Sequence, residues 1–168
     1  MIYDFNADEI FEMAEQIERN GAKFYRRMAE DISDISIRQL FLDLAAMEDE
    51  HEKTFASMRK DLSDQDRKPT VFDPEGEAAL YLRALANLRV FDEEGKEDFV
   101  LPEDLPEEEK TKKIFRVAIG LEKDSIAFYL GMKELVPERL GKKKIGDIIK
   151  EEMGHIRLLS DRLSEHKF

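Results

Sequence analysis

The 168-residue sequence contains no cysteine, which excludes several kinds of chemistry at once. Disulfide bonds, thiol catalysis, Cys-ligated zinc sites and iron–sulfur clusters all require cysteine side chains. Tryptophan is also absent, while 42% of the residues are hydrophobic and 39% are charged. This composition is typical of long amphipathic helices in a bundle rather than of a β-rich fold. The length suits one domain with its own core, so we expect a single domain over residues 1–168.

Acidic residues outnumber basic ones, and the sequence has no long apolar run. The sequence has 27 lysines and arginines against 39 aspartates and glutamates, which gives a net charge of −12. Because an acidic surface repels nucleic acid and anionic membranes, we expect neither as a partner. No stretch approaches the ~20 apolar residues of a membrane-spanning helix. Residues 1–10 lack the apolar run of a signal peptide. The sequence therefore predicts a cytoplasmic protein.

Two Glu-x-x-His units are the most informative motifs in the chain. The first joins Glu48 to His51 and the second joins Glu152 to His155, at an offset of 104 residues (155 − 51). Residues three apart on an α-helix share one face, so the carboxylate and imidazole of each unit can bind one metal ion together. The third histidine, His166, lacks this motif and is predicted to be a solvated residue.

The same offset relates two further glutamates. Glu18 and Glu122 each lie 30 residues before the glutamate of their Glu-x-x-His unit. The first is surrounded by the pattern A-x-x-I-E-x5-F-Y-x-x-M at residues 14–28, and the second by A-x-x-L-E-x5-F-Y-x-x-M at residues 118–132. The chain is therefore predicted to be a duplicated helix hairpin, with the two copies in register over both helices.

Apolar or small residues recur every three or four positions along four segments, which is the spacing of one helix face. Each stripe is interrupted or bordered near its middle by glutamate, or by glutamate and histidine, where leucine would be expected. The stripes consist of Ile10, Ala14, Ile17, Gly21, Phe24 and Met28; Ile37, Phe41, Leu44, Phe55, Met58 and Leu62; Phe115, Ala118, Ser125, Tyr129 and Met132; and Ile145, Ile148, Leu159 and Leu163.

The connections between these segments predict an all-α four-helix bundle. Turns near residues 31–36 and 137–141 are short, which predicts antiparallel helix hairpins at about 7–62 and about 107–166. The connection over residues 63–106 is long enough to cross the length of the bundle. The second and third helices are therefore expected to run parallel, as in a bundle with one crossover connection.

Local signals predict where helices begin. Asn6 and Glu9 form the capping-box pattern before the first helix, and Pro106 followed by three glutamates suits the start of the third. Within the crossover, Pro74 suits the first position of a short extra helix. We expect that helix to be followed by an acidic loop at residues 92–105.

Four carboxylates and two imidazoles are thus expected to meet in one core. Burying unpaired carboxylates costs roughly several kcal/mol each, and no lysine or arginine occupies a stripe position. Two divalent cations would neutralise four glutamates, whereas the alternative is a buried, metal-free polar network. Iron, manganese and zinc suit such ligands, and iron is favoured because the oxygen-rich set tolerates both Fe(II) and Fe(III). The predicted metal ligands are Glu18, Glu48, His51, Glu122, Glu152 and His155.

One glutamate on each of two helices, with Glu-x-x-His on the other two, resembles the ferritin-like di-iron carboxylate proteins. Within that group, Glu18 with Phe24-Tyr25 and Glu122 with Phe128-Tyr129 are similar to the rubrerythrin family. The resemblance implies a ferritin-like bundle that binds two iron ions, and a possible homodimer. It further implies one half-site of Glu18, Glu48 and His51 and another of Glu122, Glu152 and His155, with Glu48 and Glu152 as bridging ligands.

The resemblance also implies a di-iron oxidoreductase that reduces hydrogen peroxide or oxygen. Full rubrerythrins carry a Cys₄ rubredoxin-like domain that supplies electrons, which a sequence without cysteine cannot form. An external electron donor, such as a rubredoxin-like protein, is therefore expected. Rubrerythrins also have an extra glutamate near the third-helix ligand, where this sequence has Ile119 and Ser125 one turn away.

Two other functions are compatible with the sequence. The same centre would suit a ferroxidase or iron-handling protein, and the acidic helices would suit a non-enzymatic module that binds a partner. Tyr25 and Tyr129 have two possible roles, as core tyrosines or as donors to a metal ligand from a neighbouring helix. Gly21, Ser125 and Gly154 either leave room for a small oxidant or allow close helix packing.

Overall fold

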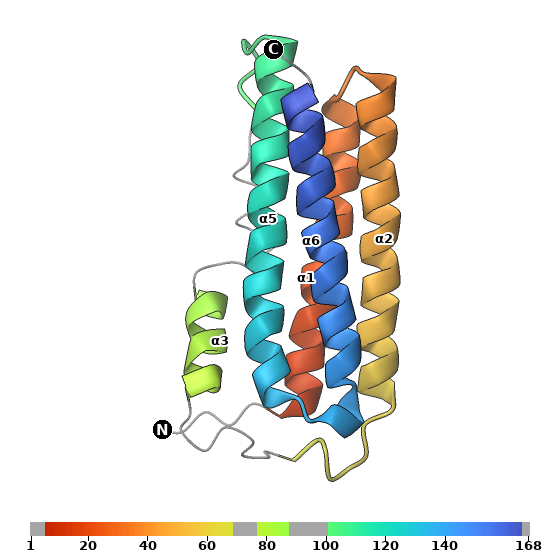
Figure 1. Ribbon diagram of the computed structural model, residues 1–168, viewed down its shortest axis with the longest axis vertical. Coiled ribbons are helices and arrows are strands. Elements are labelled where there is room, and N and C mark those ends of the chain that lie inside the picture. The colour runs from red at the N-terminus through yellow and green to blue at the C-terminus, as the bar shows by residue number, and fades with distance from the viewer. Residues whose placement is uncertain (1–5, 69–76, 88–100, 166–168) are drawn as a thin grey trace.

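The computed structural model describes residues 6–68, 77–87 and 101–165. Four long helices lie side by side within these residues: α1 (Ala7–Asp31), α2 (Ile35–Lys60), α5 (Glu107–Leu135) and α6 (Lys142–Glu165). A shorter helix, α3 (Glu77–Asn87), packs against α5 (Figure 1). The described residues contain no strand, so the predicted all-α bundle is confirmed.

The order and direction of the helices follow the predicted topology. α1 packs antiparallel against α2, and α5 packs antiparallel against α6 (Figure 1). α2 and α5 run in the same direction, so the chain returns to the other end of the bundle between them (Figure 1). The predicted start of the extra helix at Pro74, and most of the acidic loop at 92–105, lie outside the described residues.

Short polar caps and one special glycine set the helix boundaries. Asn6 Oδ1 accepts a hydrogen bond from Glu9 N at 2.9 Å, and Glu9 Oε2 accepts one from Asn6 N at 3.1 Å. This is the predicted capping box. Asp34 Oδ1 caps α2 by accepting from Ile37 N at 3.0 Å. Between α5 and α6, Gly141 has a φ of 99°, a left-handed conformation that favours glycine.

The apolar core consists of two clusters separated by a polar layer. One cluster includes Phe11, Phe55 and Phe128, and the other includes Phe41 and Phe115. Both clusters draw residues from all four long helices, and the stripe residues are buried except for the partly buried Gly21, Ser125 and Leu163. Burying each large apolar side chain stabilises the fold by about 1.5–3 kcal/mol. The two clusters therefore hold the helices together on either side of the polar layer.

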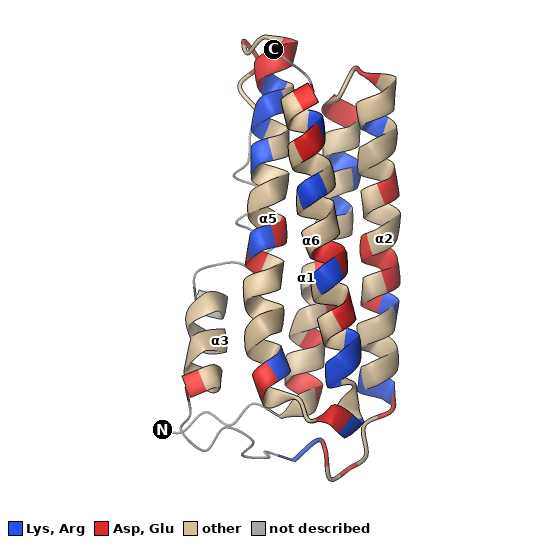
Figure 2. Ribbon diagram, in the orientation of Figure 1, with Lys and Arg blue, Asp and Glu red and all other residues tan. Residues whose placement is uncertain are grey.

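Charged residues of both signs recur along the four long helices (Figure 2). Some of them join α1 to α2: Arg19 lies 2.7 Å from Glu52, and Arg59 lies 3.0 Å from Asp8. Because these pairs are partly solvated, each contributes only about 0–1 kcal/mol. Among the described helices, none has both the length and the apolar character needed to cross a membrane.

Candidate metal centre

The six predicted metal ligands meet in the polar layer between the two apolar clusters. α1 and α5 each contribute one glutamate, whereas α2 and α6 each contribute a Glu-x-x-His unit. The exposed fractions are 0% for Glu18 and Glu152, 3% for Glu122, 4% for Glu48 and His51, and 5% for His155. Since ionisable groups are rarely buried without a partner, this cluster needs a counter-charge.

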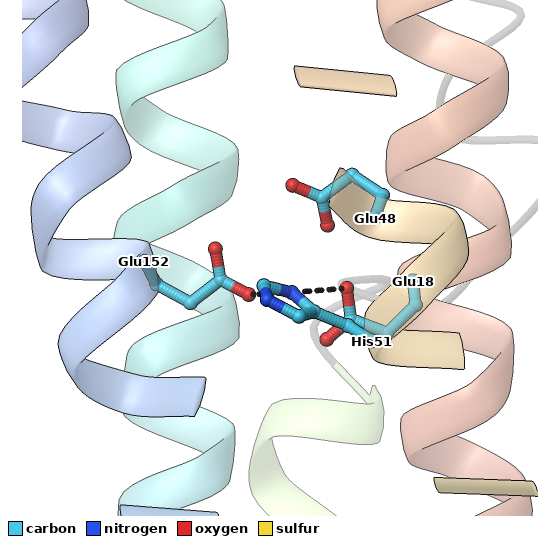
Figure 3. Close-up of side chains that lie close together, drawn as sticks. All are labelled: Glu18, Glu48, His51 and Glu152. Carbon is cyan, nitrogen blue, oxygen red and sulfur yellow. Dashed lines mark ion pairs between the residues drawn. The ribbon is translucent and has the colours of Figure 1, made fainter. Parts of the chain in front are cut away.

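The ligand atoms of these residues form two overlapping groups. Glu18 and His51 belong to the first group and Glu122 and His155 to the second, whereas Glu48 and Glu152 belong to both. Within each group, the donor atoms lie within 4.8 Å of one another. In Figure 3, the carboxylates of Glu18 and Glu152 approach the ring of His51 from opposite sides, and Glu48 lies beside them. This arrangement suits two neighbouring cations that share two carboxylates.

The imidazole rings face the centre through their Nδ1 atoms. His51 Nδ1 lies 3.0 Å from Glu152 Oε1 and 3.4 Å from Glu18 Oε2. His155 Nδ1 lies 2.8 Å from Glu152 Oε2. The two rings are nearly parallel, with an angle of 20° between their planes and centroids 5.8 Å apart. Both imidazoles therefore present the same nitrogen to the shared carboxylate.

Several polar atoms at the centre are buried without a hydrogen-bond partner among the described residues. These atoms are Glu18 Oε2, Glu48 Oε1, His51 Nδ1, both carboxylate oxygens of Glu152 and His155 Nδ1. A buried polar atom that lacks a partner costs about 1–3 kcal/mol, and a charged one costs more. Because all of these atoms belong to the two ligand groups, bound cations would satisfy them, and the residues present fit a pair of divalent metal ions.

Burial and the closeness of the carboxylates and imidazoles shift the pKa values of the centre. Burial raises the pKa of Glu122 to about 7 and also raises the pKa values of Glu18 and Glu48. Burial lowers the pKa of the two histidines, but the carboxylates beside each ring outweigh this effect and raise the pKa of both His51 and His155 to about 12. Without metal, the cluster therefore retains protons, and a metal ion must displace them.

Two buried tyrosines connect the hairpins by donating hydrogen bonds to Glu18 and Glu122, the two glutamates that each belong to only one ligand group. The Tyr129 hydroxyl of α5 donates to Glu18 Oε1, and the Tyr25 hydroxyl of α1 donates to Glu122 Oε1. Burial holds the pKa of both tyrosines well above the ordinary value, so both hydroxyls remain donors. Of the two roles considered for these residues, the structure shows the hydrogen bond to a carboxylate on a neighbouring helix.

The small residues near the centre have different roles. A Cβ added at Gly21 would lie 3.1 Å from Glu48 Oε2, so this glycine lets α1 approach that carboxylate closely. The Ser125 hydroxyl donates to the Leu121 carbonyl of its own helix at 3.1 Å. A Cβ at Gly154 would meet no atom within 4 Å. Close packing therefore accounts for Gly21, whereas it does not account for Gly154.

One residue that contacts the centre, Glu151, was not predicted from the sequence. The carboxylate of Glu151, on α6, lies 2.8 Å from Nε2 of His51, on α2. Its only sequence signal is its position four residues before His155. Since this contact joins residues 100 apart in the chain, helix periodicity does not reveal it.

Comparison with known proteins agrees with this geometry. The chain matches the family model described as Rubrerythrin over residues 9–117, which is more than half of its length. A solved structure from Thermotoga maritima, of a protein proposed to be a ferritin-like diiron-carboxylate protein, is 25% identical. That match covers 97% of each chain with a TM-score of 0.66. No curated protein matches. The family match includes Glu18, Glu48 and His51, and the remaining three cluster residues follow it in the chain.

Proposed function

Since the chain belongs to the rubrerythrin family, we propose that it is a di-iron carboxylate oxidoreductase that reduces hydrogen peroxide or oxygen. The observation that carries the proposal is the pair of overlapping ligand groups in the core. Each group offers one imidazole and three carboxylates, and two of the carboxylates are shared. Four glutamates would neutralise two divalent ions, and this oxygen-rich set suits iron in both of its common oxidation states.

The residues have distinct roles in this proposal. Glu18 and His51 would hold one ion and Glu122 and His155 the other, while Glu48 and Glu152 belong to both ligand groups. Two bound iron ions would supply two electrons to one hydrogen peroxide, which takes up two protons and leaves as two water molecules. The tyrosine hydroxyls fix one oxygen each of Glu18 and Glu122. The apolar clusters on both sides of the centre exclude bulk water.

The electrons must come from outside the 168 residues. The sequence has no cysteine with which to hold an iron–sulfur or rubredoxin-type centre. We propose a separate electron donor, such as a rubredoxin-like protein, that returns the iron to its ferrous state after each turnover.

The proposal is tested by loading the metal-free protein with Fe(II) under anaerobic conditions and then adding peroxide or oxygen at equal concentration. Stopped-flow absorbance in the near ultraviolet should show ferric iron forming in the protein, faster with peroxide than with oxygen. Glu48→Gln should abolish the signal. Glu50→Gln, which changes an exposed glutamate two residues away, should leave it unchanged.

Three results would contradict the proposal. Loaded protein that is not oxidised by either oxidant would exclude the redox activity. Continued oxidation of Fe(II) far beyond two equivalents would instead indicate a ferroxidase or iron-handling protein. No iron uptake, with unchanged stability after chelation, would indicate a helical binding module.

A further inference from the structure

Glu151 and Met47 occupy equivalent positions in the two hairpins but differ in chemistry. Each lies four residues before the histidine of its own Glu-x-x-His unit, and the offset of 104 residues relates them (151 − 47). The six predicted ligands obey the same offset with identical residue types. The two-fold equivalence of the ligands is therefore lost at this position.

Glu151 reaches across the bundle to the histidine of the other hairpin. Its Oε2 lies 2.8 Å from Nε2 of His51, while Nδ1 of the same ring lies 3.0 Å from Glu152 Oε1 at the centre. Nε2 can donate its hydrogen to Glu151 only when it carries the proton. In the neutral imidazole that binds a metal ion, a proton on Nε2 leaves the lone pair on Nδ1, which is the tautomer and orientation that a histidine ligand needs.

The second half of the centre has no equivalent contact. By the repeat, the residue that corresponds to Glu151 is Met47, which is 44% exposed and whose thioether is only a weak acceptor. Within the part of the chain that the structure describes, no carboxylate contacts Nε2 of His155. The ring of His155 therefore lacks the anionic partner that orients His51.

We infer that Glu151 is a positioning residue that makes the two metal sites unequal, so that the site of Glu18 and His51 binds a divalent cation more tightly than the site of Glu122 and His155. The inference rests on the proposed function, because it requires two metal sites. Carboxylate partners of histidine ligands typically change metal affinity by 10–100-fold. Since the side chain of Glu151 is 61% exposed, solvent weakens its effect, and we expect a difference of about tenfold.

The experiment is a titration of the metal-free full-length chain with Co(II), followed by its visible absorption bands and by calorimetry. The wild type should bind two ions in two steps that differ about tenfold in affinity. Glu151→Gln should weaken the first step by about tenfold and make the steps nearly equal, and Glu151→Asp should restore part of the difference. Met47→Glu should strengthen the second step. Asp147→Asn, which changes an exposed carboxylate one turn away on α6, is the matched control.

Proton NMR of the Co(II)-loaded protein separates positioning from a general effect on folding. Each ligand histidine should give one strongly shifted, exchangeable Nε2 proton. Glu151→Gln should shift one of these signals and speed its exchange, and the other should not move.

The outcomes distinguish this inference from the proposed function. Two equal steps in the wild type, or a Glu151→Gln titration identical to that of the wild type, would overturn the inference and leave the two-metal site intact. No Co(II) binding to any variant would overturn both. A uniform loss of affinity at both sites in Glu151→Gln would also contradict the inference, because positioning acts on His51 alone.

Discussion

The hairpin of α1 and α2 and the hairpin of α5 and α6 carry the same glutamates, histidines and tyrosines at the buried centre and different groups on their outer faces. On the outer face of the first hairpin, Arg26 forms an ion pair with Asp49. The equivalent positions of the second hairpin hold Leu130 and Met153, which are 49% and 52% exposed. The inner residues must converge on one shared centre, which constrains both copies equally. The outer residues have no such common requirement.

The two hairpins also differ in what covers them. Arg27 of α1 is exposed, whereas the equivalent Gly131 of α5 is buried beneath α3. The Tyr81 hydroxyl of α3 donates to the Ala127 carbonyl of α5 at 2.7 Å, and its ring lies directly over Gly131. The crossover thus adds a packing contact to one hairpin, while the centre keeps its two-fold pattern.

The largest expected effect is on metal affinity, and it should differ between Glu152, which both ligand groups share, and Glu122, which belongs to one group. Glu152→Gln should weaken binding of both metal ions, whereas Glu122→Gln should weaken one and spare the other. Removal of a direct ligand should lower metal affinity by more than the 10–100-fold that is typical when a hydrogen-bond partner of a ligand is removed. Competition with a chelator of known affinity would measure both steps, with the exposed Asp43→Asn variant as control. Loss of a single ion in Glu152→Gln would show that this carboxylate is not shared.

The pH dependence of the metal-free protein tests whether both hairpins contribute buried protons. Glu122 has a pKa of about 7, and His51 and His155 have pKa values of about 12, all above their ordinary values. The folded chain therefore holds protons that the unfolded chain has lost, so the contribution of these groups to stability falls as pH rises from 5 to 8. Glu122 alone should contribute roughly 3 kcal/mol to this fall.

Urea unfolding of chelator-treated protein at pH 5, 6, 7 and 8 would measure the slope. Glu122→Gln and Glu18→Gln should each flatten it, one from each hairpin. Bound metal should stabilise the protein more as pH rises, because metal replaces the protons. A metal-free protein that becomes more stable between pH 5 and 8 would contradict the assignment of the buried charges.

Tyr25 and Tyr129 test whether the two hairpins are equivalent at the centre, because their substitution should have similar effects on stability. Tyr25→Phe and Tyr129→Phe each remove one donor to a buried carboxylate. Hydrogen bonds to charged groups contribute about 1.5–3 kcal/mol, so each variant should lose a similar amount of unfolding free energy in the metal-loaded protein. Chemical unfolding would measure it. A large effect of one variant and none of the other would show that the carboxylates of Glu18 and Glu122 are not equivalent.

Gly131 tests how much the packing of α3 on the second hairpin contributes to stability. A Cβ at Gly131 would lie 2.6 Å from Tyr81 Cδ1, so Gly131→Ala should displace α3 and cost about 1–3 kcal/mol. The equivalent Arg27→Ala change lies on an exposed face, where an ion pair or hydrogen bond contributes about 0–1 kcal/mol, and should cost less than Gly131→Ala. Thermal unfolding would compare the two. Equal effects would mean that α3 adds nothing to the stability of the second hairpin.

The smallest effect concerns the outer faces. The double change Leu130→Arg with Met153→Asp would copy the ion pair of the first hairpin onto the second. Exposed ion pairs contribute about 0–1 kcal/mol, so a double-mutant cycle should give a coupling below 1 kcal/mol with metal binding unchanged. A large decrease in metal affinity would show that residues on the outer face help to hold the metal centre in place.

The interior of the fold could be predicted from the sequence because helix periodicity places residues on a face. Glu48 and His51 were recognisable because they interrupt an apolar stripe, and the offset of 104 then identified the second unit. Contacts between helices were harder to predict from the sequence. The face of Tyr25 was predictable, but which carboxylate its hydroxyl reaches depends on how the hairpins pack. Glu151 was missed for the same reason, since its contact with His51 crosses between hairpins.

The central claim is that one buried cluster of four glutamates and two histidines holds two metal ions. Anomalous X-ray diffraction at the iron absorption edge, from crystals grown with Fe(II), tests it most directly. We predict two anomalous peaks in the core of each chain, one beside Glu18 and His51 and one beside Glu122 and His155, both in contact with Glu48 and Glu152. An empty core, with peaks only on surface carboxylates, would contradict it.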